Sequence, residues 1–155
     1  TASSEFEILA PVSGELVHLE KTNDPAFSSR AVGDGVAVVP QEGTVCAPVS
    51  GTVAALFPTE HALGIMSDDS SAQVMLHIGI DTVKLEGKGF HALVAQGDHV
   101  DAGQALVEVD FDAVRAAGFD PTVFVIVCER SENSTLREHA SGPVAVKEPV
   151  VWLSE

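Results

Sequence analysis

His77 lies in an apolar run whose alternating pattern predicts a β-strand. Along residues 74–83, with the sequence VMLHIGIDTV, Val74, Leu76 and Ile78 fall on one face of such a strand, and His77 falls on the other. A glycine follows His77 by two residues and an aspartate follows it by four. An imidazole that a rigid strand presents beside a glycine is suited to proton or phosphoryl transfer.

A second histidine, His61, follows a threonine by two residues. In an extended segment Thr59 and His61 share a face, so the threonine hydroxyl can bond one ring nitrogen and fix the tautomer of the other. Taken alone, this pattern favours a surface or core histidine over a catalytic one, and the balance reverses if His61 lies across a sheet from His77. The other four histidines have contexts that favour structural roles: His18, His91, His99 and His139.

Two facing imidazoles suit phosphoryl transfer. One neutral ring can attack phosphorus while the other donates a hydrogen bond to the phosphoryl oxygens, and such chemistry depends on positioning and electrostatic stabilisation. The Gly-x-x-x-x-Gly-Lys-Ser/Thr motif of nucleotide-binding loops is absent from the sequence. We therefore expect another protein, rather than bound ATP, to supply the phosphoryl group.

The elements that must position these residues are predicted to be β-strands. The motif LAPVSGEL at residues 9–16 returns as CAPVSGTV at residues 46–53, an offset of 37 residues, which indicates an internally duplicated β-structure. Further apolar strands at short intervals favour an all-β, antiparallel sandwich, with 123–127 as a central strand. These strands are expected at residues 36–39, 105–109, 123–127, 144–146 and 150–153.

Helix is expected to be scarce, at most one or two short segments. Residues 111–117 form the best candidate, with Asp110 as its N-cap and Gly118 as its stop. The polar stretch 131–140 is predicted to be a loop or a single helical turn. No linker divides the chain, so we expect one domain spanning residues 1–155.

The composition limits the partners that the protein can bind. The 155 residues carry a formal net charge of -15, with only eight lysines and arginines. Such a surface should repel nucleic acid and anionic membranes, and it favours a basic protein partner. The sequence shows no signal peptide and no long apolar span, which predicts a cytoplasmic protein. Both cysteines, Cys46 and Cys128, lie in apolar runs and are expected to be reduced and buried.

These motifs together resemble the glucose-family enzyme IIA component of the bacterial phosphoenolpyruvate-dependent sugar phosphotransferase system. The resemblance covers nearly the whole chain, and its most specific part is the order of residues around His77. It implies a β-sandwich with a duplicated hybrid motif. The basic N-terminal tail of some free-standing members is missing, which fits a IIA domain excised from a larger permease, and the sequence leaves both a free-standing and a fused domain open. The segments that carry it include residues 10–14, 32–35, 47–53, 59–62 and 77–87.

The resemblance assigns a role to each residue around the two histidines. His77 corresponds to the histidine that accepts a phosphoryl group on Nε2 from the small phosphocarrier HPr. His61 corresponds to the histidine that stabilises this group, and Thr59 to the hydroxyl that orients His61. The backbone carbonyl of Gly79 is expected to hold the Nδ1–H of the phosphorylated ring. No cofactor is expected.

The resemblance also implies a binding surface for partner proteins. Asp24 and Asp81 correspond to acidic residues at the rim that face an arginine of the partner. Phe27 and Phe57 correspond to apolar residues that frame the depression. The phosphoryl group then passes to a cysteine on the IIB domain of a sugar permease, and regulatory protein targets are a further class of partner.

Two other readings of the sequence remain open at this point. A biotinyl or lipoyl carrier would share the turns at residues 97–106, but it needs a lysine at a hairpin tip with a characteristic neighbour such as methionine, which the chain lacks. A zinc-dependent hydrolase could use His61, His77 and Asp81 as ligands with one open position, although the usual His-x-His motif is missing. Even without such an enzyme, His61 and His77 could bind zinc opportunistically.

Overall fold

The described part of the chain folds into antiparallel β-sheets with two short α-helices. The computed structural model describes residues 6–30, 33–41, 43–68, 72–130 and 133–154. Every pairing between its strands is antiparallel. The largest sheet has eight strands in the order β13 (Gly142–Val144), β2 (Gly14–His18), β3 (Asp34–Pro40), β11 (Val123–Arg130), β7 (Ala72–Ile78), β6 (Ala62–Ser67), β5 (Gly51–Leu56) and β9 (His99–Val100).

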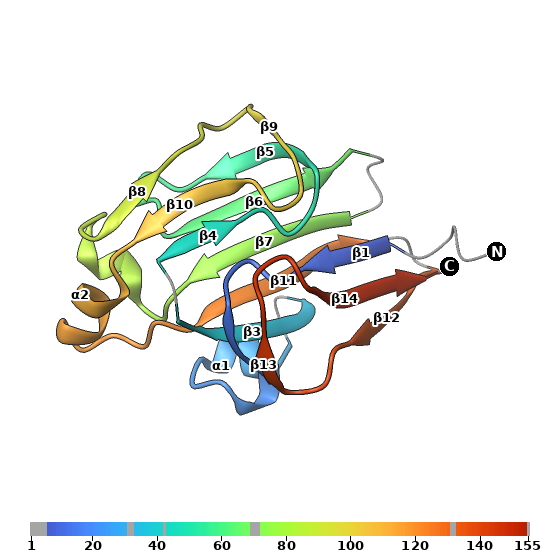
Figure 1. Ribbon diagram of the computed structural model, residues 1–155, viewed down its shortest axis with the longest axis horizontal. Coiled ribbons are helices and arrows are strands. Elements are labelled where there is room, and N and C mark those ends of the chain that lie inside the picture. Colours follow the sequence, from blue (N-terminus) through green and yellow to red (C-terminus); the bar gives the residue numbers. More distant parts are fainter. Residues whose placement is uncertain (1–5, 31–32, 42, 69–71, 131–132, 155) are drawn as a thin grey trace.

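Two three-stranded sheets complete the sandwich (Figure 1). The first pairs the two ends of the chain and consists of β1 (Phe6–Leu9), β14 (Pro149–Ser154) and β12 (Thr135–Glu138). The second consists of β4 (Thr44–Cys46), β10 (Ala105–Val109) and β8 (Phe90–Ala92). One apolar cluster contains buried residues of all three sheets, among them Ile8, Val45 and Val74, so the layers share a single core.

The opposite face of the large sheet carries a smaller apolar cluster. Strand alternation sends Phe124 and Ile126 of β11 to this face, while Val123 and Val125 enter the main core. The cluster is completed by Ala37 of β3, by Leu19 of the 3₁₀ helix η2 (Leu19–Lys21) and by Phe27 of α1 (Pro25–Ser28). His77 belongs to the strand beside β11, so its ring lies next to this cluster.

The repeated sequence motif forms two turns that bond to each other. The Leu9 N–H donates to the Pro48 carbonyl at 2.9 Å, and the Cys46 N–H donates to the Pro11 carbonyl at 2.7 Å. Cys46 and Pro48 stand 37 residues after Leu9 and Pro11, so they occupy the same positions in the second copy of the motif. Each copy therefore donates the same hydrogen bond to the other copy. The duplication in the sequence is therefore a local two-fold symmetry of the fold.

The serines of the two copies repeat this symmetry. Ser13 Oγ accepts from the Val146 N–H at 2.9 Å, and Ser50 Oγ accepts from the Ala102 N–H at 2.8 Å. Each motif thus bonds to a turn that connects two sheets, between β13 and β14 for Ser13 and between β9 and β10 for Ser50.

Most predicted elements are present. Helix α2 (Phe111–Ala116) begins as expected, since the Asp110 carboxylate accepts from the Ala113 N–H at 3.0 Å. The prediction for residues 131–140 was wrong, because β12 forms within this stretch and pairs with β14; residues 131–132 lie outside the described part. β12 was missed because it is a polar strand at the edge of its sheet and its sequence contains no apolar run. Within β12, Leu136 is the residue that packs against the main core.

Smaller differences concern one strand end and one cysteine. The strand expected at residues 144–146 ends at Val144, because the Glu148 N–H donates to the Ala145 carbonyl and closes a turn. Neither Cys46 nor Cys128 forms a disulfide, in agreement with the expected reduced state. Cys46 is buried, whereas Cys128 is only partly buried because it lies at the margin of the smaller cluster.

Candidate functional site

His61, which directly precedes β6, lies beside His77 of the neighbouring strand β7. In the pairing of β6 with β7, Ala62 stands opposite His77, and the Ile78 N–H donates to the His61 carbonyl at 2.8 Å. The two ring centroids are 5.1 Å apart, and the ring planes meet edge to face at 85°. The structure therefore brings together the two imidazoles that the sequence left 16 positions apart.

The alternation expected for β7 is present. Val74, Leu76 and Ile78 are buried in the main core, while the His77 side chain lies on the other face and is partly exposed. Since β7 lies between β6 and β11, three hydrogen-bonded strands hold the His77 backbone. The ring is thus presented by a rigid element.

Both Nδ1 atoms are held by protein oxygens. His77 Nδ1 lies 2.8 Å from the Gly79 carbonyl oxygen, which can only accept, so Nδ1 carries the proton and Nε2 of the neutral ring keeps its lone pair. His61 Nδ1 lies 2.5 Å from Thr59 Oγ1. When this hydroxyl donates to Nδ1, the proton of the neutral His61 ring lies on Nε2. One Nε2 is then a nucleophile and the other a donor.

The turn after β7 aims the Gly79 carbonyl at His77. Gly79 has a φ of +81°, and a Cβ at this position would lie 2.4 Å from Thr82 Cγ2. The Gly79 N–H donates to the Thr122 carbonyl at 2.8 Å. Only glycine fits this positive φ and this close approach without strain, so the spacing of two residues between His77 and Gly79 has a steric reason.

Aromatic and acidic side chains surround the two rings. Phe27 contacts His77 with centroids 5.2 Å apart, and Phe57 contacts His61 with centroids 5.4 Å apart. The charges of Asp24 and Asp81 act on His77 and favour its protonated form. The structure thus places the predicted rim residues around the histidine pair.

Burial keeps both rings neutral near pH 7. Desolvation, and to a smaller extent the neighbouring His77 ring, lowers the pKa of His61 from its usual 6.5 to about 4. Desolvation also lowers the pKa of His77, although the Gly79 carbonyl and the carboxylates of Asp24 and Asp81 oppose this effect. Neutral His77 keeps the Nε2 lone pair that a nucleophile needs.

Some contributing residues were missed by the sequence analysis. Phe124 stacks on Phe27 at 4.4 Å and stands opposite His77 in the β11–β7 pairing, so strand alternation could have placed it beside the site. The 3₁₀ helix η3 (Thr82–Leu85), which follows Asp81 directly, carries the half-exposed Val83, and no periodic pattern predicts this helix. Asp120 and Thr122 hold the turn at Gly79 through backbone hydrogen bonds. These residues are far from Gly79 in the sequence, so no local pattern predicts the contact.

The zinc hydrolase expected as an alternative is not supported. Within the described residues no group of three or more His, Cys, Asp or Glu side chains is close enough to hold a metal ion. His61 and His77 could offer only two ligands, which is fewer than the three protein ligands of catalytic zinc sites.

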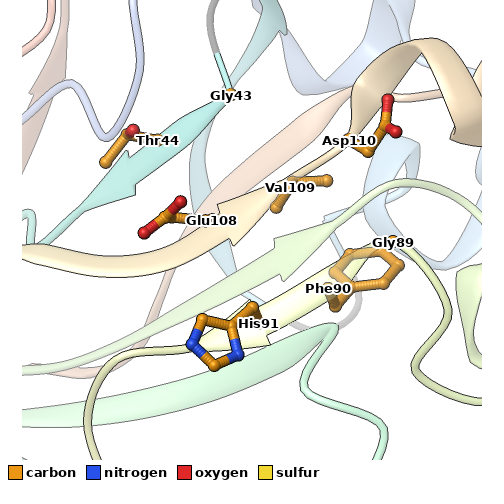
Figure 2. Close-up of a pocket in the computed structure, with 8 residues that line it drawn as sticks. All are labelled: Gly43, Thr44, Gly89, Phe90, His91, Glu108, Val109 and Asp110. Carbon is orange, nitrogen blue, oxygen red and sulfur yellow. The ribbon is translucent and has the colours of Figure 1, made fainter.

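A separate cavity of about 470 Å³ lies over the sheet of β4, β10 and β8 (Figure 2). His91, Glu108 and Asp110 are among its lining residues, whereas neither His61 nor His77 lines it. His91 and Glu108 are cross-strand neighbours, and all three of these side chains are exposed. The cavity is therefore an open groove, distinct from the histidine pair.

Comparison with known proteins gives a consistent family. The family described as phosphoenolpyruvate-dependent sugar phosphotransferase system, EIIA 1, matches residues 6–133. The glucose-specific EIICBA component of this kind of system from Streptococcus pneumoniae is 42% identical over 144 residues, which are 93% of this chain and 20% of that relative. The glucose-specific EIIA component from Bacillus cereus is 42% identical over 145 residues, which are 94% of this chain and 87% of that relative.

Among solved structures, glucose permease IIA from Mycoplasma capricolum matches with a TM-score of 0.88 and 34% identity, covering 96% of this chain and 95% of that chain. The predicted all-β fold and the resemblance drawn from the motifs are confirmed, and the biotinyl or lipoyl alternative falls away. The chain spans about a fifth of the length of the fused relatives that it matches. No helix in the described segments is long and apolar enough to cross a bilayer.

Proposed function

Since the chain belongs to the EIIA 1 family of the phosphoenolpyruvate-dependent sugar phosphotransferase system and is a phosphocarrier of that system, we propose that His77 Nε2 is its phosphoryl acceptor. The donor is phospho-HPr, and the next acceptor is a cysteine on the IIB domain of a sugar permease. The observation that carries this proposal is the pair of rings 5.1 Å apart, with each Nδ1 held by a protein oxygen. The two Nε2 atoms are left to act on one phosphoryl group.

The transfer needs no cofactor. The Nε2 lone pair of neutral His77 forms a bond to phosphorus as the bond from phosphorus to the donor breaks. The ring gains positive charge in this step, and the Gly79 carbonyl together with the carboxylates of Asp24 and Asp81 stabilises that charge. His61 Nε2–H donates to a phosphoryl oxygen as charge moves between donor and acceptor.

The second transfer reverses the first. A thiolate of the IIB domain attacks phosphorus, the N–P bond breaks, and its electron pair returns to Nε2 of His77. His77 is again a neutral ring with its proton on Nδ1, so no proton enters or leaves the site. Because Thr59 holds His61 in one tautomer, its Nε2–H is available in both directions.

The surface around the site supports docking of basic, partly apolar proteins. Phe57, whose ring contacts His61, is 46% exposed, and Val83, two residues after Asp81, is 50% exposed. Asp24 and Asp81 add negative charge near the rings, and the whole chain carries -15. An apolar patch with an acidic rim fits a partner that presents an arginine beside an apolar face.

We place this function in a single IIA domain on the cytoplasmic side of a permease. Relatives named EIICBA and EIIBCA are several times longer than the matched segment, whereas the relative named EIIA is of similar length. Either arrangement brings the domain to a IIB partner. A fused IIB would meet it at high effective concentration, while a separate one would need the docking surface just described.

The test combines enzyme I, HPr and labelled phosphoenolpyruvate with purified variants. We expect the wild-type chain to take up one acid-labile phosphoryl group and His77→Ala to take up none. His61→Gln should still be labelled but should fail to pass the label to a IIB domain. His99→Ala is the matched control, because His99 bonds to Asp68 and takes no part in the site. Label on His77→Ala equal to that on the control would overturn the assignment.

A further inference from the structure

The Asp120 carboxylate bonds to two segments that lie far apart in the sequence and that both contribute to the site. Its Oδ1 accepts from the Thr122 N–H at 2.9 Å and from Thr122 Oγ1 at 2.5 Å. Its Oδ2 accepts from Asn23 Nδ2 at 3.1 Å. Asp120 therefore bonds the start of β11 to the segment between η2 and α1.

The Thr122 end of this link leads to His77 through the backbone. The Asp120 carbonyl accepts from the Ile80 N–H at 2.9 Å, and the Thr122 carbonyl accepts from the Gly79 N–H at 2.8 Å. These two bonds fix the turn whose Gly79 carbonyl holds His77 Nδ1. Thr122 is only 6% exposed, so this anchor is buried.

The Asn23 end leads to the other wall of the site. Asp24 follows Asn23 directly, and its carbonyl accepts from the N–H groups of Phe27 and Ser28 at 3.1 and 2.8 Å, which starts α1. Phe27 packs against His77. A movement of Asn23 would therefore carry both the Asp24 charge and the Phe27 ring with it.

Asp120 acts through its ionised form. Burial by itself favours the neutral acid, but the bonds from the Thr122 hydroxyl, the Thr122 N–H and Asn23 outweigh burial and lower the pKa of the carboxyl. Hydrogen bonds to an ionised acceptor are stronger than bonds between neutral groups. The link is thus a charged clamp, part-buried at Thr122 and exposed at Asn23.

We propose that Asp120 is a positioning residue for phosphoryl transfer, because its carboxylate clamps the Asn23 segment and the Gly79 turn against each other on either side of His77. This inference rests on the proposed function for the reaction that it serves. Its immediate effect, however, is on the unphosphorylated protein. The clamp keeps the proton of neutral His77 on Nδ1 and so keeps the Nε2 lone pair open to the partner.

Three variants test the clamp. Asp120→Ala removes the carboxylate and its hydrogen bonds to Thr122 and Asn23, while the backbone bond to Ile80 can remain. Asn23→Asp sets two carboxylates 3.1 Å apart in place of the donor and acceptor. Adding Asp120→Asn to Asn23→Asp reverses the polarity: the new amide at position 120 accepts from Thr122 through its oxygen and donates through its nitrogen to the new carboxylate. The double variant keeps the net charge of the wild type, so it should rescue the link.

Two measurements are made on each variant. Nitrogen-15 NMR of the imidazoles reports the fraction of neutral His77 that carries its proton on Nδ1, and steady-state assays separate kcat from KM for phospho-HPr. We expect Asp120→Ala and Asn23→Asp to lower the Nδ1–H fraction and to lower kcat by about 10- to 100-fold, because a misplacement of about 1 Å can cost up to ~100-fold. KM should change little, and the double variant should recover both readouts.

The matched control is Asp98→Ala, which removes a turn carboxylate that accepts from the Ala95 N–H far along the chain from the site. A wild-type tautomer and kcat in Asn23→Asp would overturn the proposal, and so would a double variant no better than Asn23→Asp. If Asp120→Ala does not fold, the comparison of Asn23→Asp with the double variant still tests the proposal. If no variant and no wild-type chain accepts phosphate, the proposed function fails, while the NMR result still decides whether Asp120 positions His77.

Discussion

Acid should destabilise this protein through His61 more than through a typical histidine. His61 is 3% exposed, and its pKa falls from 6.5 to about 4 on burial beside His77. An unfolded chain therefore binds a proton on this ring at pH values where the folded chain does not. Stability rises with pH wherever the unfolded state binds more protons, so this contribution grows from about pH 4 to about pH 6.5 and is constant above.

The size of the effect follows from the gap between the two values. A gap of about 2.5 pH units at about 1.4 kcal/mol for each unit corresponds to about 3 kcal/mol. Since the free energy of unfolding of a domain is about 5–15 kcal/mol, this one ring is worth a substantial part of it. Desolvation also lowers the pKa of His77 in the folded chain. This ring therefore adds to the stability that is lost at low pH.

The assay is urea unfolding at a series of pH values from 4 to 7.5, on the wild type and on His61→Gln. Glutamine does not titrate, so the difference between the two curves isolates His61 from the many carboxylates that titrate in the same range. We expect the wild type to lose about 3 kcal/mol more than the variant between pH 7 and pH 4. Parallel curves would refute the claim that His61 is buried as a neutral ring, as would an NMR titration of His61 near 6.5.

Three further outcomes are expected from substitutions at the site. Gly79→Ala should lower the free energy of unfolding by about 2–5 kcal/mol in urea, because φ is +81° and the new Cβ meets Thr82 Cγ2 at 2.4 Å; a loss below about 1 kcal/mol would contradict this geometry. Thr59→Val should slow transfer to a IIB domain about fivefold in single-turnover assays, since one hydrogen bond of about 1 kcal/mol no longer selects the His61 tautomer, whereas Thr59→Ser should retain the rate. Phe57→Ala should raise KM for phospho-HPr about tenfold while changing the free energy of unfolding by about 1 kcal/mol or less, and an unchanged KM would exclude Phe57 from the docking surface.

Features that depend on neighbouring residues could be predicted from the sequence. The faces of β7 follow from alternation, because Val74, Leu76 and Ile78 enter the main core, whereas Met75 and His77 lie on the opposite face. The repeat at residues 9–16 and 46–53 predicted duplicated turns, since the same residues impose the same backbone. The start of α2 followed from a single cap at Asp110.

Features that depend on pairing over long distances could not be predicted in this way. β12 is polar and becomes a strand only because β14 offers it a partner. Helix α1 is a single turn that is stabilised by Phe27 packing on Phe124, and its sequence has no helical period. The bond between Asn23 and Asp120 joins residues 97 positions apart. The proximity of His61 to His77 was likewise implied by the family resemblance rather than by any local pattern.

The half-covered face of the large sheet explains how one site can be both dry and accessible. The smaller cluster under η2 and α1 buries the side of His77 that faces Phe124, which lowers the pKa and keeps the nucleophile neutral. The other side stays open, since the His77 side chain is partly exposed and Phe57 beside His61 is 46% exposed. A phosphoryl group on Nε2 would therefore remain exposed to water until a partner protein covers those two side chains, so the partner completes the exclusion of water that the domain begins. This division of roles requires that the phosphorylated chain hydrolyse faster alone than when docked to an unreactive HPr or IIB variant, and equal rates of hydrolysis would contradict it.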